Sequence, residues 1–490
     1  MDVEYGFPLQ KWILENFCIE AIIESSVEPW FTDARVSNVV TLLRREPDLK
    51  KRMNNLVRFV QVCRTLEDIL IDAQHGDDRI GAAETIRARI LETKKNTEGK
   101  DWRIRVVRQR DLIEGPDGDN PSHHIGGKWG IHLRAPDIYF ELMDQFRDRF
   151  VPLRELAEVR FGVKTGCDAF FFPRDITDEV LEKLTDPEFK KRYGITKGDT
   201  RRIRVCKAGD GSVHLIEAEY LEPEVHSLMD IDSIVIDAGS LGRVAVVVNK
   251  AKSALRDSHV LKYIRWGEKQ KFHLRDTCAA RQTETHNWYQ IEPGSRSFGI
   301  LPKIQQYRHI VPLNGAGLLV NCSLLELCIA KSDQEALIGV LNSTIVGLFK
   351  WSYGRGLGRE ANLQLDVYSA EMMPVPNVAK FSPEEVSGIK QAFQALKLGT
   401  RANLADELAW HERVSLDRAV LGALGVSPGE EERILKSLYE AVRTQHVQMR
   451  DLELKAQENR RKAARGGESG PETATNVQWE IPDESEQIED

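Results

Sequence analysis

The first 45 residues constrain the fold more than any other part of the chain, because they join a short helix directly to two strand-like runs. Residues 5–17 predict a helix with Pro8 near its start and four apolar side chains on one face: Leu9, Trp12, Ile13 and Phe17. Residues 18–24 and 36–43 are short apolar runs rich in β-branched side chains, which is typical of strands. So few pieces cannot form an open α/β sheet alone, and their exposed edges therefore predict a docking surface.

The composition is that of an ordinary soluble protein. With 490 residues, 41% of them hydrophobic and 29% charged, the chain is long enough for two or three cores. No apolar run approaches the roughly 20 residues that a membrane-spanning helix requires, and the N-terminus lacks a signal-peptide pattern. We therefore expect a cytoplasmic protein.

The net charge of −8 by itself disfavours a nucleic-acid binder, but the acidic residues are unevenly distributed. Eight acids lie in the C-terminal tail without a compensating base: Glu468, Glu472, Glu480, Asp483, Glu484, Glu486, Glu489 and Asp490. The rest of the chain sums to zero. A neutral body can carry local basic faces, and such faces are what neutralise phosphates.

The cysteine and histidine patterns predict no metal site. The seven cysteines include no Cys-x-x-Cys pair and no His at zinc-finger spacing, so we expect most of them to be reduced and packed. His123 and His124 lie in a Gly-rich loop without a supporting Cys or carboxylate pattern. We expect that loop to be solvated.

After residue 45 the pattern becomes helical. Apolar residues recur at three- and four-residue spacing from Met53 to Leu70, which predicts one helix, and a second helix is expected at 80–93. We expect a strand at 102–110, a loop at 115–127 and a helix at 138–148. Residues 151–376 mix short strands, turns and a few helices, which indicates an α+β domain. Residues 383–462 are again helical, and the tail from residue 466 is expected to be disordered.

Two parts of the chain resemble bacterial adenine-N6 DNA methyltransferases of restriction-modification systems. The helix, strand, aromatic turn and strand at 5–44, with the run Asp33-Ala-Arg-Val-Ser-Asn-Val-Val40, resemble the end of the catalytic domain. Residues 161–376 resemble the target-recognition domain. Three segments carry this second resemblance: Phe161-Gly-Val-Lys-Thr-Gly-Cys-Asp-Ala-Phe-Phe171, Arg281-Gln-Thr-Glu-Thr-His-Asn-Trp-Tyr289, and Leu341-Asn-Ser-Thr344 through Leu365 to Met373-Pro-Val-Pro376.

The resemblance implies a chain of five parts. Residues 1–45 would be an α/β remnant, the last strands of a doubly wound methyltransferase sheet, and 46–135 a helical insertion with a connecting strand and loops. Residues 136–378 would be an α+β target-recognition (specificity) domain. A C-terminal helical segment would follow at 379–463, and an acidic disordered tail at 464–490.

Two motifs that methyl transfer requires are missing. One is a Gly-rich turn for the cofactor, and the other is a polar-Pro-Pro-aromatic tetrapeptide, yet all 19 prolines are isolated. Of the Gly-x-Gly candidates, 209–211 and 315–317 predict hairpin turns, and the glycines at 354, 356 and 358 also lack the required context. In the family both motifs lie upstream of the part that resembles 5–44. We therefore expect no catalytic residue and no S-adenosylmethionine binding in this chain alone, with the cofactor held in the complete enzyme.

The resemblance also assigns a role to Phe31. This residue matches an aromatic position that stacks on an adenine extruded from the duplex, and base flipping is required because the amino nitrogen is buried in the stack. The alternative is that Phe31 or Trp30 caps the sheet.

Several cations are candidate DNA ligands. In the loop at 162–166, Lys164 and Thr165 offer a cation and a hydroxyl to phosphate. A first basic cluster comprises Lys190, Lys191, Arg192, Lys197, Arg201, Arg202 and Arg204. A second comprises Lys262, Arg265, Lys269, Lys271, His273, Arg275 and Arg281, interleaved with Tyr263, Trp266 and Phe272. Arg355 and Arg359 flank glycines that let a partner approach closely, although solvated faces and a flexible turn are the alternative interpretations.

These observations favour the DNA-recognition part of a site-specific adenine-N6 DNA methyltransferase that binds double-stranded DNA in restriction-modification or phage defence. A separate chain would carry the missing motifs of this transferase. Two alternatives stay open: a non-catalytic specificity or scaffold subunit, and a truncated remnant.

Overall fold

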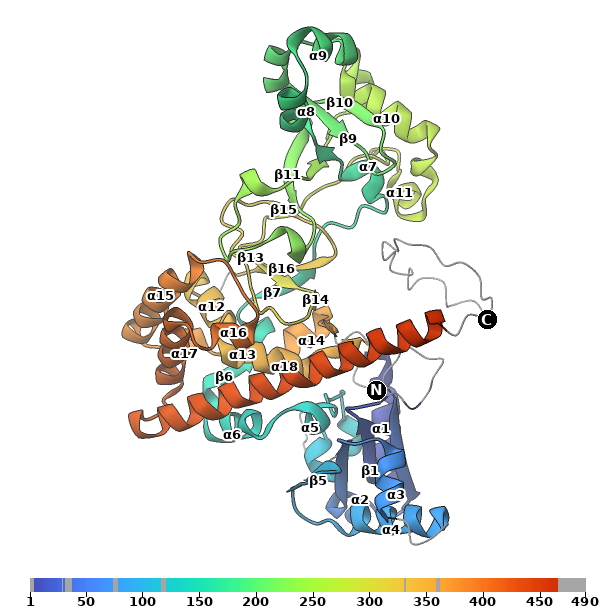
Figure 1. Ribbon diagram of the computed structural model, residues 1–490, viewed down its shortest axis with the longest axis vertical. Coiled ribbons are helices and arrows are strands. Elements are labelled where there is room, and N and C mark those ends of the chain that lie inside the picture. Colours follow the sequence, from blue (N-terminus) through green and yellow to red (C-terminus); the bar gives the residue numbers. More distant parts are fainter. Residues whose placement is uncertain are drawn as a thin grey trace.

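The computed structural model describes residues 4–28, 30, 38–73, 78–115, 120–329, 332–357 and 362–465. A five-stranded sheet formed by the N-terminal residues lies at one end of the molecule, and helices α7 to α11 with their strands lie at the other (Figure 1). The long helix α18 (Pro428–Arg465) crosses the middle. Among the described helices, none is both long and apolar enough to cross a bilayer.

The N-terminal sheet has the strand order β2-β1-β3-β5-β4. Its central strands are β1 (Phe17–Ser25) and β3 (Leu56–Val62), which pair in parallel. The other strands pair antiparallel: β2 (Val39–Arg45), β5 (Trp102–Arg108) and β4 (Thr97–Glu98). The helices of this region are α1 (Phe7–Asn16), α2 (Leu49–Asn54), α3 (Leu66–Ala73) and α4 (Arg79–Glu92). The boundary expected after residue 45 therefore falls between strands of one sheet.

The single helix expected between Met53 and Leu70 is wrong, because the middle of that segment is strand β3. Val57, Phe59, Val60 and Val62 are all buried, since β3 lies inside the sheet with apolar clusters on both faces. A strand buried on both faces loses the polar-apolar alternation that identifies strands, so its spacing can imitate a helix. The elements expected at 5–17, 18–24, 80–93 and 102–110 are confirmed, and so is the strand expected at 36–43 over residues 39–43; residues 36 and 37 lie outside the described residues.

The buried face of α1 also differs from the expected one. Ile13 is buried as predicted, but Leu9 and Trp12 are about half exposed, and Gln10 is buried instead. The Gln10 amide donates to the Gly127 carbonyl at 2.8 Å, accepts from the Gly127 N–H at 2.9 Å and contacts His124 Nε2 at 3.0 Å. A buried amide with all these partners is compatible with the core, because its polar groups are satisfied.

Residues 150–376 form several small sheets joined by short helices, which agrees with an α+β domain. The strand orders are β19-β6, β13-β16-β7, β10-β9-β8, β12-β11-β15 and β14-β18-β17. The strands are β6 (Phe150–Pro152), β7 (Glu158–Phe161), β8 (Arg174–Asp175), β9 (Ile203–Lys207), β10 (Val213–Glu217), β11 (Leu221–Val225), β12 (Val244–Val246), β13 (Gly299–Pro302), β14 (Ile304–Gln305), β15 (Leu319–Val320), β16 (Leu324–Cys328), β17 (Arg355–Leu357), β18 (Asn362–Gln364) and β19 (Pro374–Pro376).

The two Gly-x-Gly turns have different outcomes. The turn at 209–211 joins β9 to β10 in an antiparallel hairpin, as expected. The turn at 315–317 does not form a hairpin, because β14 on one side pairs with β18 whereas β15 on the other pairs with β11.

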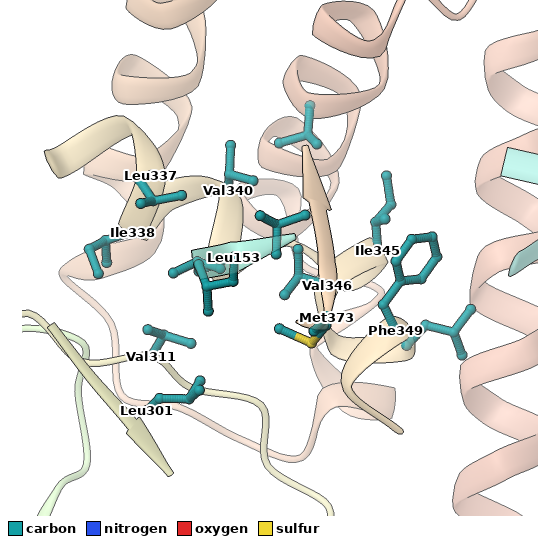
Figure 2. Close-up of a cluster of buried hydrophobic side chains, with 14 of the residues drawn as sticks. Leu153, Leu301, Val311, Leu337, Ile338, Val340, Ile345, Val346, Phe349 and Met373 are labelled. Atoms are coloured by element: carbon teal, nitrogen blue, oxygen red, sulfur yellow. The ribbon is translucent and has the colours of Figure 1, made fainter. Parts of the chain in front are cut away.

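Most helices after residue 130 cover the largest core: α5 (Ile131–Arg134), α6 (Asp137–Gln145), α12 (Gln334–Leu341), α13 (Thr344–Tyr353), α14 (Val367–Met372), α15 (Pro383–Lys397), α16 (Leu404–Glu407) and α17 (His411–Leu424). Five others pack on two smaller cores: α7 (Asp168–Phe171), α8 (Thr177–Lys183), α9 (Asp186–Tyr193), α10 (His259–Lys269) and α11 (Asp276–Arg281). Side chains of α12 and α13 meet Leu153, Leu301, Val311 and Met373 in the largest core (Figure 2). The expected C-terminal helical segment is present as α15 to α18, and it packs on the same core.

Candidate nucleic-acid interface

The loop at 162–166 is held closely against its neighbours. A Cβ on Gly162 would lie 2.3 Å from the Asn321 carbonyl oxygen, and Gly166 has a positive φ of +75° beside Thr277 of α11. Thr165 is fully buried; its hydroxyl donates to Asp168 Oδ1 at 2.6 Å and accepts from the Cys167 N–H at 3.1 Å. The Thr165 hydroxyl thus organises the loop from inside, whereas Lys164 is exposed at its tip.

Arg281 fixes this loop from the side. Its guanidinium donates to the carbonyl oxygens of Trp288 and Thr165, both at 2.9 Å, and of Lys164 at 3.3 Å. The same group lies 5.3 Å from the centre of the Phe171 ring. Because most of its donors are already used, Arg281 positions the loop and is poorly suited to grip phosphate through a bidentate contact.

A pocket of about 340 Å³ opens beside the loop. Lys164 and Arg281 line it together with Arg160, which pairs with Glu326 at 3.0 Å. Glu292 lies on the same wall. The pocket therefore carries both signs of charge.

The aromatic residues of the second basic cluster do not form a DNA-facing surface, which corrects the sequence-based interpretation. Tyr263 is buried; its hydroxyl donates to the Phe170 carbonyl at 2.6 Å and its ring stacks on Phe170 at 4.7 Å. Trp266 stacks on Tyr263 at 5.1 Å, and Phe272 packs against the same cluster. The alternation of aromatic and basic residues reflects the two faces of α10, one packed and one exposed.

The opposite face of α10 is exposed and basic. Lys262, Arg265 and Lys269 recur at three- and four-residue spacing and all three are exposed. Lys271 follows just after the C-terminal end of α10, Arg275 is the N-cap residue of α11, and both are also exposed. Across the described part of the chain, these five cations form no ion pair with an acid. We call Lys262, Arg265, Lys269, Lys271 and Arg275 the α10 basic face.

Two acids adjoin this face in sequence. Glu268 pairs with Lys252 and accepts from the Trp288 indole at 3.1 Å. Asp276, next to Arg275, is exposed in the first turn of α11 and forms no ion pair within the described residues. Arg275 lies 5.4 Å from the centre of the Phe272 ring, which orients its guanidinium without neutralising it.

The first basic cluster is partly neutralised. Arg204 pairs with Asp175 at 2.7 Å and Lys197 with Asp186 at 3.3 Å. Lys190, Lys191 and Arg192 occupy the last turn of α9, where cations stabilise the helix dipole. Ion pairs and the dipole of α9 therefore account for several cations of this cluster, whereas the α10 basic face has no ion pairs within the described residues.

Arg355 lies in a different place, near the end of strand β1. Arg134 donates to Glu24 of β1 at 3.2 Å and to the Gly354 carbonyl at 3.3 Å, so it links the N-terminal sheet to the start of β17. Arg355 itself donates to Gln364 Oε1 at 3.1 Å across the β17–β18 pair. Arg359, the second cation of this glycine-containing segment, lies outside the described residues.

Phe31, the candidate for base stacking, also lies outside the described residues. The neighbouring Trp30 is partly buried against a cluster that includes Ala21 and Val60. Its indole N–H is buried without a hydrogen-bond partner in the described ranges. Trp30 thus behaves as the sheet-capping residue, which leaves the stacking role of Phe31 as a prediction.

The structure brings most of the candidate DNA ligands into one region. Lys164 and Thr165 lie in the loop that Arg281 holds, and Thr277 of α11 touches Gly166 of that loop. The α10 basic face is joined to the loop through α11. Sequence reasoning missed three further cations, Arg174, Lys207 and Arg243, which are far apart in the chain and meet only through strand pairing.

The cysteines and histidines show the effects of burial. The structure contains no group of three or more His, Cys, Asp or Glu side chains able to hold a metal, as far as its described ranges extend. All seven cysteines are free thiols, and burial raises the pKa of Cys167 to about 11. Burial lowers the pKa of His124 to about 4, which keeps this ring neutral beside Gln10.

Comparison with known proteins adds one low-similarity match. No protein-family model matches the chain, and no curated protein does. Among solved structures, the chain is similar to the type IIG restriction endonuclease BpuSI, with a TM-score of 0.43 and 11% sequence identity. The match covers 91% of this chain and 46% of that enzyme, so the chain spans less than half of its length. A TM-score this low does not establish a common fold, and the functional case therefore rests on the residues described above.

Proposed function

We propose that this chain is the DNA-recognition part of a site-specific adenine-N6 DNA methyltransferase of a restriction-modification or phage-defence system. The observation that carries the proposal is the α10 basic face, which places five exposed cations without acidic partners, within the described residues, beside the loop at 162–166. The family resemblance of residues 161–376 supplies the expectation that this region recognises DNA.

The physical argument concerns counterions. Each cation that neutralises a phosphate releases a condensed counterion, so the affinity of a basic surface for DNA falls steeply with salt. An aromatic core of Phe170, Tyr263 and Trp266 supports the α10 basic face from behind. Such support keeps the cations on a rigid element, which favours a fixed register on the duplex.

The proposal includes a second component that carries the cofactor and catalytic motifs. Strand β2 is an edge of the N-terminal sheet, and Val39, Val40 and Leu43 on it are 37–44% exposed. A partner surface bearing the S-adenosylmethionine site and the catalytic tetrapeptide would cover this edge, because exposed apolar edges pair readily. Phe31 would then stack on the flipped adenine.

Duplex binding by the purified chain tests the proposal. The logarithm of the binding constant, measured by fluorescence anisotropy, should fall linearly with the logarithm of salt concentration. Replacing Arg265, Lys271 and Arg275 together with Gln should reduce the magnitude of that slope by about 3, since each phosphate contact contributes roughly 0.9. The exposed Arg443→Gln variant on α18 is the control and should leave the slope unchanged.

Two results would overturn the proposal. One is the absence of salt-dependent duplex binding by the wild-type chain. The other is measurable S-adenosylmethionine affinity of the chain alone by calorimetry, because the proposal places that site in the second component.

A further inference from the structure

Three cations stand side by side across neighbouring strands at a place that neither basic cluster includes. Arg174 of β8 pairs directly with Lys207 of β9 in the antiparallel register, and an isolated bridge pairs Arg174 with Arg243 on the other side. Residues directly opposite each other project from the same face of a sheet, with Cβ atoms about 5 Å apart. Arg174, Lys207 and Arg243 therefore form a row of like charges, which we call the β8 cation row.

Such a row is unfavourable by itself, because like charges placed directly opposite each other destabilise a strand pair. Only Arg174 has an acidic partner, Glu179 at 2.9 Å, and both side chains of that pair are about half exposed, so solvent screens it. Lys207 and Arg243 form no ion pair within the described residues. The repulsion is thus left largely uncompensated by the chain.

Within the described residues, the acids around the row form no ion pair with Lys207 or Arg243. Asp210 lies nearby but accepts from the Ser212 N–H and hydroxyl at 2.9 and 2.6 Å. Burial raises the pKa of Glu224 and the charge of Arg243 acts to lower it, but the carboxylate of Glu224 forms its hydrogen bond with His226 at 3.0 Å. Arg243 is held in place by donating to the Phe172 carbonyl at 3.3 Å.

The row borders a hollow that fits an anion. The hollow has a volume of about 380 Å³ and is lined by Arg174, Lys207 and Arg243 with a single acid, Asp210. Gly209 and Gly211 also line the hollow. Gly209 packs closely against Ala169, since a Cβ on it would lie 2.6 Å from the Ala169 Cα, and Gly211 has a positive φ of +86°.

We propose that the β8 cation row binds a backbone phosphate of duplex DNA, as an anchor separate from the α10 basic face; this inference rests on the proposed function. The row is connected along the chain to the loop at 162–166, which α11 joins to the α10 basic face. Residues 160–164 line the pocket beside that loop, and Phe172 and Arg174 line the hollow. A duplex held at both places would be fixed in register along the segment that joins them.

The test compares a double variant with a matched control. Lys207→Gln with Arg243→Gln should lower the magnitude of the salt slope for duplex binding by about 2. The control, Lys436→Gln with Arg443→Gln, also removes one Lys and one Arg, from exposed positions on α18, and should change nothing. Removing like-charge repulsion should leave the melting temperature equal or raised, which shows that the double variant is folded.

Each outcome has a defined meaning. If the wild-type chain binds DNA with a steep slope but the double variant keeps that slope, the inference fails and the proposed function stands. If the wild-type chain does not bind DNA, the proposed function fails. A titration with inorganic phosphate distinguishes free phosphate from DNA as the source of the anion. If the wild-type chain binds inorganic phosphate and the double variant does not, while both have the same salt slope for duplex binding, the assignment to DNA is overturned.

Discussion

The N-terminal sheet region (residues 4–135) and the remainder of the chain (136–465) differ in how completely they cover their apolar and charged groups. The N-terminal region exposes Tyr5, Leu9 and Trp12 on its helical side and Val39 and Leu43 on its edge strand. The remainder instead buries charged groups and supplies partners for most of them. Arg413 and Glu407, for example, pair with both side chains at most 1% exposed.

This difference separates a region with exposed apolar surface from a region that is largely covered. On β1, Glu24 pairs with Val39 and Ile19 pairs with Leu43. Paired residues project from the same face of a sheet, and α1 packs against Ile19. Leu43, and Val39 at an even spacing from it, therefore lie on the face that α1 covers. The exposed apolar side chains of α1 and those of Val39 and Leu43 are therefore on one side of the sheet, and Val40 projects from the other. An apolar surface of this kind is typical of a contact site for another protein surface.

The largest expected effect concerns the buried charges of the second region. Glu407 pairs with Arg413 and with Arg401 at 3.4 Å, so Glu407→Gln leaves two buried guanidinium groups without their carboxylate. The free energy of unfolding should fall by about 3 to 5 kcal/mol. Hydrogen exchange should accelerate in α13 and α17 and stay unchanged in β1 to β5.

Glu440→Gln, on the exposed side of α18, is the matched control and should change stability by less than about 0.5 kcal/mol. Faster exchange in the N-terminal sheet of Glu407→Gln would mean that the two regions unfold together, and the comparison would then fail.

A pH-dependent effect of similar size comes from Lys350 on α13, which is fully buried and donates to Gln305. Burial lowers the pKa of Lys350 from its ordinary value of 10.5 to about 7. Between these values the unfolded chain binds a proton that the folded chain does not, so stability is lost as the pH falls from 10.5 to 7. Relative to Lys350→Met, the wild-type protein should gain up to about 4 kcal/mol between pH 7 and pH 10.

Urea unfolding of the wild-type protein and of Lys350→Met across that pH range measures the difference between their free energies of unfolding. The other titrating groups are common to both proteins, so their contributions cancel in this difference. Lys436→Met on exposed α18 should show no such dependence. A difference independent of pH would show that Lys350 is charged in the folded protein at pH 7.

The smallest effect on stability is expected on the exposed edge of the first region. Val39→Lys with Leu43→Lys should change the melting temperature very little, because exposed substitutions alter stability by about 0.5 kcal/mol or less each. Binding of an apolar dye such as anilinonaphthalene sulfonate should fall clearly, since charge replaces exposed apolar surface. A large drop in melting temperature would instead show that this edge is already covered within the chain.

Local patterns predicted the elements whose stabilising contacts are local. Helices α1 and α4 follow from periodicity and position along the chain, and the β9–β10 hairpin follows from the glycines at 209 and 211. Strand β3 was not recognised, because burial on both faces removed its alternation. Gln10 was overlooked as a core residue because its partners His124 and Gly127 lie more than 100 residues away.

The sequence predicted which cations belong to the candidate site, but not how their side chains are arranged in space. Lys164, Arg265, Lys271 and Arg275 are exposed as a DNA-binding role requires, but Thr165 and Arg281 are used inside the loop. The error at Tyr263 and Trp266 arose because helix residues three or four apart share a face: Tyr263 and Trp266 lie on the packed face of α10, whereas Lys262, Arg265 and Lys269 lie on the exposed one. The β8 cation row was invisible in the sequence, since strand pairing alone unites its members.

The β6–β19 pair has a consequence for the order of folding during synthesis. It joins Pro152 to Pro374, roughly 220 residues apart, whereas every strand of the N-terminal sheet lies between residues 17 and 108. At typical elongation rates of about 5–20 residues per second, β6 waits roughly 10–45 s for its partner strand to be made. The N-terminal sheet can thus be complete on the ribosome long before the core that contains β6 and β19 closes, and its exposed edge is available for contacts during that interval.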